Sequence, residues 1–465
     1  MIKKILLLIV VISIATFSYF SSDIRQLVNL ANGFAAKNIC SGYYNSGYSL
    51  SEVQQQALIP IDPTFGYVSI EHDEQNKELI ASMFGFLERK AVYREGLGCT
   101  LLGVEQQQLT SRVNSYQFKA KLRDDIEWPN GLAAVNSAIE VDAEALNSAI
   151  DRAFSEPNNK TKRQAKAVAI VHKGQLIAER YAAPISKHTP LLSWSMAKSV
   201  TNLLIGTLVY KNKLDIYQPT PVALWQQGND PRSKITIDQM LRMSSGLEFN
   251  ETYGLISDVS IMLSSTVSNA DYAKQKPLIY EPDTHWAYAS GTSNILAQIV
   301  FNTIGGNLQN QYEYAQRELF EPLNIHTAIT EMDGSDTFVG SSYFYASARD
   351  WAKLGQLMLQ DGVWNGQRLL PEGWVKYSST ATATAPKSQY GAHFWLNAQP
   401  SDSAKESRWP SAPNDIYYMG GYQGQFVIIV PSHDLVIVRL GFTYPKSDAG
   451  MEDLIVSVIE ALSKK

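Results

Sequence analysis

Ser195-Met196-Ala197-Lys198 opens the run SMAKSVTNLLIGTLVYK (residues 195–211), whose apolar spacing predicts a helix. Side chains three residues apart on a helix share a face, so we expect the Ser195 hydroxyl beside the Lys198 amine. A serine is a weak nucleophile until a base removes its proton. Burial or the positive end of a helix can lower the pKa of a lysine enough for it to act as that base. An ordinary helix start with a serine cap would fit the same four residues.

Two predicted hairpins frame this run. In the first, Ala165–His172 and Gln175–Tyr181 flank Lys173-Gly174, and in the second, Phe426–Val430 and Leu435–Leu440 flank residues 431–434. Further helical patterns cover Ile237–Met243, Gly291–Phe301, Ala348–Leu359 and Asp453–Ser463. Hairpins near both ends with helices between them predict an α/β (α+β) fold. Its antiparallel sheet is built from distant segments, and helices pack on it.

Two further segments carry chemistry. Tyr288-Ala289-Ser290 lies on a predicted loop before a helix, and a tyrosine hydroxyl near a lysine can relay a proton to a leaving group. Met419-Gly420-Gly421-Tyr422 runs into a strand, where glycines let the backbone approach a ligand and donate N–H groups to an oxyanion. The alternatives are a half-buried loop tyrosine and a glycine bulge without a ligand.

The N-terminal residues predict export. A basic start with Lys3 and Lys4 precedes Ile5–Phe20, sixteen residues without a charge, which is the layout of a secretory signal. Bulky residues stand where a small-residue cleavage site is expected, so we predict a signal sequence or a retained inner-membrane anchor at residues 1–20. A periplasmic or other extracytoplasmic location follows, and a buried core helix is the alternative.

The two cysteines, Cys40 and Cys99, both follow this segment. An even number in an exported chain favours a disulfide, and two buried free thiols are the alternative. Closing a loop of this length contributes about 4 kcal/mol in the chain-entropy treatment. The sequence shows no histidine and cysteine spacing typical of a metal site, so we predict neither a metal nor a cofactor.

The chain of 465 residues is long enough for more than one domain. Pro129-Asn130-Gly131 is turn chemistry, so we place a boundary there, between an N-terminal extension (residues 21–128) and a catalytic domain (residues 129–465). A net charge of -5 gives no electrostatic footprint for nucleic acid. The sequence leaves the oligomeric state open.

In this order and spacing, Ser-x-x-Lys, Tyr-x-Ser and a glycine-rich strand resemble the serine β-lactamase and penicillin-binding superfamily. Within it, the chain looks most like the class C-type branch, and closest to the 6-aminohexanoate-dimer (nylon oligomer) hydrolase-like enzymes. The resemblance covers roughly residues 130–465. It implies a β-lactamase/transpeptidase-like fold, in which a mainly helical subdomain accompanies the sheet.

The resemblance also implies roles for individual residues. Ser195 would be the nucleophile, Lys198 its base and Tyr288 the partner general acid and base. The backbone N–H groups of Ser195 and of a residue near Tyr422 would form the oxyanion hole. The substrate-binding positions implied in the same way are Tyr253, Ser290, Gly420 and Gly421.

Two departures from the family pattern bear on the substrate. The β-lactamases carry Lys-Thr-Gly where this chain has Met419-Gly420-Gly421, so the cation that helps to hold an acidic substrate group is missing. Ser290 also replaces the asparagine often found in Tyr-x-Asn. Both changes favour a small-molecule amide or ester without a required carboxylate over a β-lactam or a peptidoglycan peptide. A penicillin-binding DD-peptidase or β-lactamase, and a non-catalytic envelope binding protein, remain the alternatives.

Overall fold

The computed structural model describes residues 2–106, 108–119, 123, 125–131, 133, 139–158, 160–253, 256–397, 407–445 and 449–463, with side chains described from residue 22 to residue 462 of these ranges.

A six-stranded antiparallel sheet lies at the centre of the molecule, in the order β12-β13-β14-β15-β5-β6. The strands are β5 (Ala165–His172), β6 (Gln175–Tyr181), β12 (Trp395–Leu396), β13 (Tyr417–Gly421), β14 (Gln425–Val430) and β15 (Leu435–Gly441). The hairpin β5–β6 therefore pairs with β15, more than 250 residues later in the chain. Both predicted hairpins and the antiparallel sheet of distant segments are confirmed.

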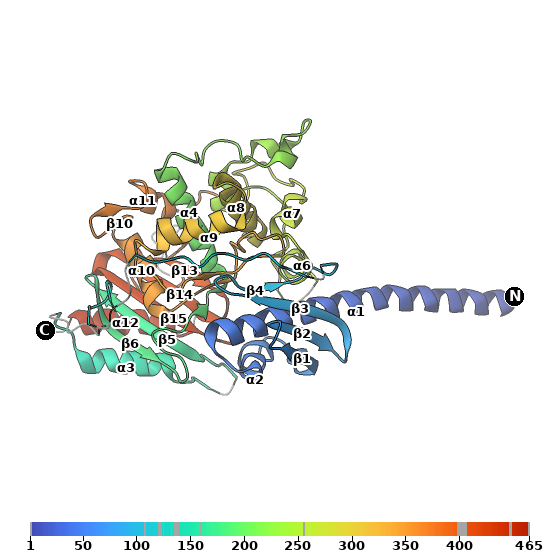
Figure 1. Cartoon of the computed structure of the whole chain (residues 1–465), viewed down its shortest axis with the longest axis horizontal. Helices are drawn as coiled ribbons and strands as arrows, with labels where there is room; N and C mark the ends of the chain where they lie inside the picture. The colour runs from blue at the N-terminus through green and yellow to red at the C-terminus, as the bar shows by residue number, and fades with distance from the viewer. Residues whose placement is uncertain are drawn as a thin grey trace.

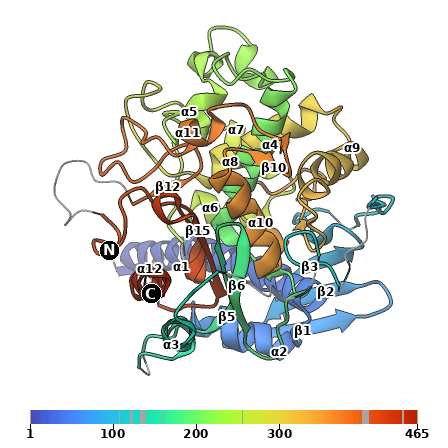
Figure 2. The same cartoon turned by 90° about the vertical axis from the view of Figure 1, so that its left-hand side faces the viewer.

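Helices cover both faces of this sheet. Successive β5 residues alternate between two cores, because side chains along a strand point to opposite faces: Ala167 and Ala169 lie in one core, and Val168 and Ile170 in the other. Helix α10 (Ala348–Leu359) packs on the first face, while α3 (Ala143–Phe154) and α12 (Met451–Ser463) pack together on the second (Figure 2). The central strands are buried on both sides for this reason.

A mainly helical part lies next to the sheet (Figure 1). Its helices are α4 (Ala197–Tyr210), α5 (Ile237–Leu241), α6 (Asp258–Ser265), α7 (Asn269–Lys274), α8 (Ser290–Thr303), α9 (Leu308–Ala315) and α11 (Trp374–Ser378). Helix α4 is buried on nearly every side, and it packs against α8 and the π-helical segment Gln316–Phe320. Two small sheets complete this region: β7 (Leu191–Leu192) with β9 (Phe344–Ala346) and β8 (Ile329–Thr330), and β10 (Val363–Trp364) with β11 (Gln367–Arg368).

The N-terminal region forms its own layer of helix and sheet. Helix α1 (Ile2–Ser46) packs on a four-stranded antiparallel sheet of β1 (Val68–Asp73), β2 (Glu78–Met83), β3 (Phe86–Arg94) and β4 (Gly98–Leu101), with the short helix α2 (Leu50–Val53) beside it. The predicted disulfide is present, and it joins Cys40 of α1 to Cys99 of β4 with a Cα–Cα distance of 6.0 Å. The domain boundary at residues 129–131 stays a prediction.

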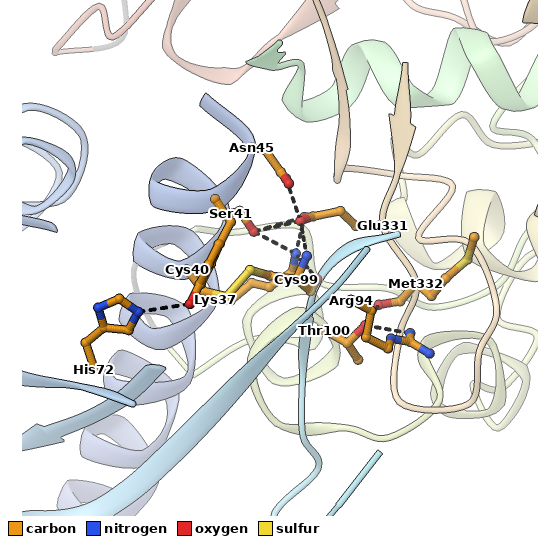
Figure 3. Close-up of a disulfide and its surroundings, with 11 residues drawn as sticks. Lys37, Cys40, Ser41, Asn45, His72, Arg94, Cys99, Thr100, Glu331 and Met332 are labelled. Atoms are coloured by element: carbon orange, nitrogen blue, oxygen red, sulfur yellow. Dashed lines mark hydrogen bonds and ion pairs between the residues drawn. A yellow bond between two sulfur atoms is a disulfide. The ribbon is translucent and has the colours of Figure 1, made fainter. Parts of the chain in front are cut away.

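A buried carboxylate fastens this extension to the rest of the chain. Glu331, directly after β8, forms an ion pair with Lys37 of α1, and both side chains are almost completely buried (Figure 3). Glu331 Oε1 also accepts hydrogen bonds from Ser41 Oγ at 2.9 Å, Asn45 Nδ2 at 2.8 Å and the Cys99 backbone N–H at 2.6 Å. Among the described residues, the donors to this carboxylate all come from residues 37–99, so the extension supplies the hydrogen bonds of a side chain that belongs to the later part of the chain.

Residues 5–20 belong to helix α1, which extends past the body of the molecule toward the N-terminus (Figure 1). In the described part of the chain, no helix has the length and apolar character needed to cross a bilayer. The signal or anchor role of residues 1–20 stays a prediction.

Candidate active site

The segment before α4 holds Ser195 at a sharp turn. Residues Trp194–Met196 form a single 3₁₀ turn, and α4 proper begins at Ala197, two residues later than the apolar spacing predicts. Trp194 has φ +47°, a left-handed conformation that is costly for a bulky residue and is found where surrounding contacts enforce it. Its buried ring stacks on Phe34 of α1 (ring centroids 5.9 Å apart) and lies edge-on to Tyr422. The turn leaves the Ser195 side chain partly exposed.

Lys198 lies within reach of the Ser195 hydroxyl. Its Nζ is 3.3 Å from Ser195 Oγ, 3.0 Å from Ser290 Oγ and 3.2 Å from the carbonyl oxygen of Ser341. The residue is 1% exposed, and burial lowers the pKa of its amine to about 8, although the Glu251 carboxylate opposes this change. At neutral pH an appreciable fraction of Lys198 is therefore uncharged and able to accept a proton.

Tyr288 is the third member of the predicted constellation, and it lies beside the other two. Lys198 Nζ is 4.7 Å from the centre of the Tyr288 ring, and the Ser195 side chain is near enough to the Tyr288 hydroxyl to lower its pKa. Burial, followed by the Glu251 carboxylate, raises the pKa of Tyr288 well above its usual value, so the phenol keeps its proton. The rings of Trp395 and Tyr390 pack against it at 5.2 Å and 5.7 Å and fix its position.

Glu251, a half-buried residue, completes a polar chain behind Lys198. Ser290 Oγ accepts from Lys198 and donates to Glu251 Oε1 at 2.6 Å, while the Ser290 backbone N–H at the start of α8 donates to Glu251 Oε2 at 2.7 Å. The Ser290 side chain is completely buried and both of its hydrogen bonds point inward. Direct contact of Ser290 with a substrate stays a prediction, and the structure places this hydroxyl between a base and a carboxylate.

The end of strand β13 approaches the nucleophile closely. A Cβ atom on Gly421 would lie 2.2 Å from the carbonyl oxygen of Ser193, so only glycine allows this approach. Gln423, two residues on, accepts from Trp194 Nε1 at 3.1 Å and donates to the carbonyl oxygen of Ala57 at 3.0 Å. The Gln423 side chain therefore connects three parts of the molecule. These are its own segment between β13 and β14, the turn that contains Ser195, and the extension.

The predicted substrate-side residues contact neighbours of Ser195, Lys198 and Tyr288. Tyr253 is 40% exposed, donates to Glu251 Oε1 at 3.0 Å, and stacks on Tyr422 with ring centroids 5.7 Å apart. Gly420 lies against Trp395, which also contacts Tyr288. The structure therefore brings the predicted residues together, while the substrate contacts of Tyr253, Gly420 and Gly421 and the oxyanion role of Tyr422 stay predictions.

Glu251, a half-buried residue behind the site, escaped the sequence analysis, and His393, a histidine near the predicted cleft that fits no Ser-His-Asp arrangement, lies buried beside Lys198. Glu251 stands two positions before Tyr253, and an acidic residue beside a candidate substrate tyrosine was the available signal. His393 is buried against α4: its Nδ1 lies 2.8 Å from the carbonyl oxygen of Lys198, and its Nε2 lies 3.1 Å from Ser293 Oγ. Burial lowers the pKa of His393 to about 3, so the ring is neutral and supports the helix.

Comparison with known proteins agrees with this geometry. The sequence model of the Beta-lactamase family matches residues 150–458. The 6-aminohexanoate-dimer hydrolase of Paenarthrobacter ureafaciens is 24% identical over 294 residues, which cover 61% of this chain and 73% of that protein. The chain is also similar to a solved structure from Bacillus anthracis that bears the name 6-aminohexanoate-dimer hydrolase (TM-score 0.53, 20% identity, covering 75% of this chain and 87% of that one).

A second similar solved structure is EstCE1, a hydrolase with promiscuous acyltransferase activity. The match has a TM-score of 0.54 at 14% identity and covers 70% of this chain and 98% of that one. These structural likenesses establish a shared fold. Because the family match spans most of the chain and contains Ser195, Lys198 and Tyr288, this protein belongs to the Beta-lactamase family of serine hydrolases.

Proposed function

We propose that the protein hydrolyses an amide or ester bond of a small molecule through an acyl-enzyme on Ser195. The observation that carries the proposal is the contact between the partly exposed Ser195 hydroxyl and the buried, low-pKa amine of Lys198. The name of one similar protein, a 6-aminohexanoate-dimer hydrolase, favours a linear amide as the bond that is cleaved.

In the acylation step, neutral Lys198 removes the proton from Ser195 Oγ as this oxygen attacks the carbonyl carbon. The carbonyl oxygen becomes an oxyanion, which the backbone N–H of Ser195 and a donor at the end of β13 would stabilise. The tetrahedral intermediate collapses when the leaving amine or alcohol takes a proton from Tyr288, which recovers one from Lys198. Water then attacks the ester of Ser195 by the same steps and releases the acid.

The end of β13 favours this reaction over β-lactam hydrolysis. Met419 stands where the β-lactamase pattern has a lysine, and its side chain is completely buried. Tyr253 stacks on Tyr422, which in turn contacts Trp194, the residue before Ser195, so aromatic rings and no cation follow Met419 at the end of this strand. We therefore place a penicillin-binding or β-lactamase activity second, and a non-catalytic binding protein third.

A hydrolysis screen with p-nitrophenyl esters and short linear amides tests the proposal. Ser195→Ala should abolish turnover and leave the circular dichroism spectrum unchanged. The matched control is Ser432→Ala, an exposed serine at the far end of the β14–β15 hairpin. Turnover that persists in Ser195→Ala would overturn the assignment.

Two probes separate the alternatives. Stoichiometric labelling of Ser195 by a fluorescent penicillin would favour the second activity, and no labelling by a fluorophosphonate would favour the third.

We also propose an extracytoplasmic location. The disulfide supports it, since such bonds persist in oxidising compartments, and so does the basic and apolar layout of residues 1–20. Fusing alkaline phosphatase to the C-terminus, which is active only after export, tests this location in cells.

A further inference from the structure

The extension exposes large apolar side chains at one end. The tip of the hairpin β2–β3 carries Phe84 and Phe86, which are 68% and 69% exposed, and Tyr67 lies beside them, with its ring centroid 5.4 Å from that of Phe84. The tip lies against α1, since Asn32 Nδ2 donates to the carbonyl oxygens of Phe86 and Leu87. Ile24 and Leu27 are exposed on the stretch of α1 that precedes Asn32. We call these six residues the tip patch: Ile24, Leu27, Tyr67, Phe84, Phe86 and Leu87.

Folding alone does not explain the residue at the turn. Phe84 and Gly85 form a two-residue turn in which both residues have positive φ, +52° and +74°. Such turns favour Asn-Gly or Asp-Gly, because a bulky residue is strained in the left-handed region. An aromatic residue at this position has two free-energy costs, the backbone strain and the exposure of its ring to water. Its presence therefore points to a contact outside this chain.

The path of helix α1 indicates which partner these exposed residues contact. The same helix leads from Leu27 and Ile24 into residues 5–20, sixteen residues without a charge, behind Lys3 and Lys4. In Figure 1, the β2–β3 hairpin and the outgoing half of α1 lie at the same end of the molecule. An aromatic and aliphatic surface that continues into an uncharged helix matches a lipid bilayer, where aromatic rings sit at the headgroup level.

We propose that the tip patch is a membrane-contact surface, which rests on the headgroup region of a bilayer and fixes the orientation of the enzyme at the membrane. The uncharged part of α1 would hold the chain at the bilayer, and the hairpin would be a second, separate contact. Two contacts prevent the body from turning freely about α1, so the site would face a constant direction. This inference does not depend on the reaction at Ser195.

A site-specific fluorophore tests the contact. Because Cys40 and Cys99 are paired in the disulfide, a cysteine introduced by Phe86→Cys is a single reactive thiol. The full chain, labelled there with an environment-sensitive nitrobenzoxadiazole dye, is reconstituted into vesicles of equal parts phosphatidylethanolamine and phosphatidylglycerol. The control is Tyr217→Cys, at an equally exposed residue (65%) of the helical part.

We expect a blue-shifted emission at position 86 and several-fold stronger quenching by headgroup-labelled lipid there than at position 217. Equal quenching at the two positions would overturn the proposal, as would a signal at position 86 that follows protein concentration without lipid, which would indicate contact with a second copy. Phe84→Asn relieves the turn, so it should retain or raise the melting temperature while reducing quenching at position 86. A lower melting temperature with unchanged quenching would assign Phe84 a purely structural role and contradict the proposal.

Discussion

Ser290 Oγ donates a 2.6 Å hydrogen bond to Oε1 of Glu251, and this contact connects the carboxylate to Lys198, the proposed general base. The same hydroxyl lies 3.0 Å from Lys198 Nζ, so the negative charge of Glu251 acts on the protonated lysine through a single intervening group. Glu251 raises the pKa of Lys198 against the effect of burial. The protonation of the base is therefore set by a residue outside the three-membered motif.

Glu251→Gln should move the acidic limb of the pH profile of kcat/KM to lower pH by on the order of one pH unit, because it removes the charge that stabilises protonated Lys198. Initial rates on a p-nitrophenyl ester between pH 5 and pH 9 measure this shift. Glu248→Gln, an exposed neighbour, is the control and should leave the limb in place. A limb that stays in place in Glu251→Gln would mean that the carboxylate does not influence the base.

The unmodified enzyme should lose activity as the pH falls. With the pKa of Lys198 at about 8, the uncharged base is present above that pH and is lost below it, so kcat/KM should fall about tenfold for each pH unit well below 8. Lys198→Arg should be inactive over the whole range, because arginine stays charged. A flat profile from pH 6 to pH 9 would exclude Lys198 as the titrating group.

Tyr288→Phe should reduce kcat by about 10²- to 10⁴-fold, the usual contribution of a general acid or base. The ring contacts with Trp395 and Tyr390 remain, so the melting temperature should change little. Tyr390→Phe removes a hydroxyl from the same aromatic cluster and should keep nearly full activity. Similar losses of kcat in the two variants would show that the Tyr288 hydroxyl supports aromatic packing and does not transfer a proton.

Gln423→Met should lower kcat on the order of tenfold to a hundredfold with a smaller change in KM. It preserves the length of the side chain but removes the hydrogen bonds to Trp194 and Ala57, so the turn before Ser195 and the end of β13 lose their alignment. Two buried polar groups without partners should also cost about 1–3 kcal/mol each in urea unfolding. Gln226→Met, on the exposed surface, is the control; a loss of stability with unchanged kcat would restrict Gln423 to a structural role.

Lys37→Met should destabilise the protein by about 3–5 kcal/mol, because it leaves the Glu331 carboxylate buried without its ion partner. The double variant Lys37→Met/Glu331→Leu should recover most of this loss, since replacing both charges by apolar groups removes the cost of burying them. Urea unfolding of both variants measures the coupling. Additive losses would show that the two side chains act independently.

Local patterns in the sequence were sufficient for much of the fold. Helix α10 occupies the predicted residues Ala348–Leu359, because a 12-residue apolar stripe and the serine cap at Ser347 define it without help from the rest of the chain. The spacing of Ser195 and Lys198 placed two groups of the site together for the same reason. The later start of α4 could not be foreseen, because contacts of Trp194 with Phe34 and Gln423 enforce the turn.

The supporting residues of the site depend on contacts that no local pattern reports. Glu251 reaches Ser290 across 39 residues, and Gln423 reaches Ala57 across 366. Nothing near Glu331 in the sequence indicates that its carboxylate is buried among donors from residues 37–99. Sequence patterns predict elements and motifs here, while the polar groups that orient the motif follow only from tertiary packing.

The carboxylate of Glu331 has a consequence for the history of this chain. Lys37 of the extension is almost completely buried, and in its described surroundings Glu331 is the carboxylate that pairs with it. Replacing the acid would leave the Lys37 ammonium buried without its ion partner, whereas losing the extension would expose the carboxylate to water. The extension therefore depends on an acid at this position. Members of the family that carry an N-terminal extension of this kind are expected to have a glutamate at the corresponding position.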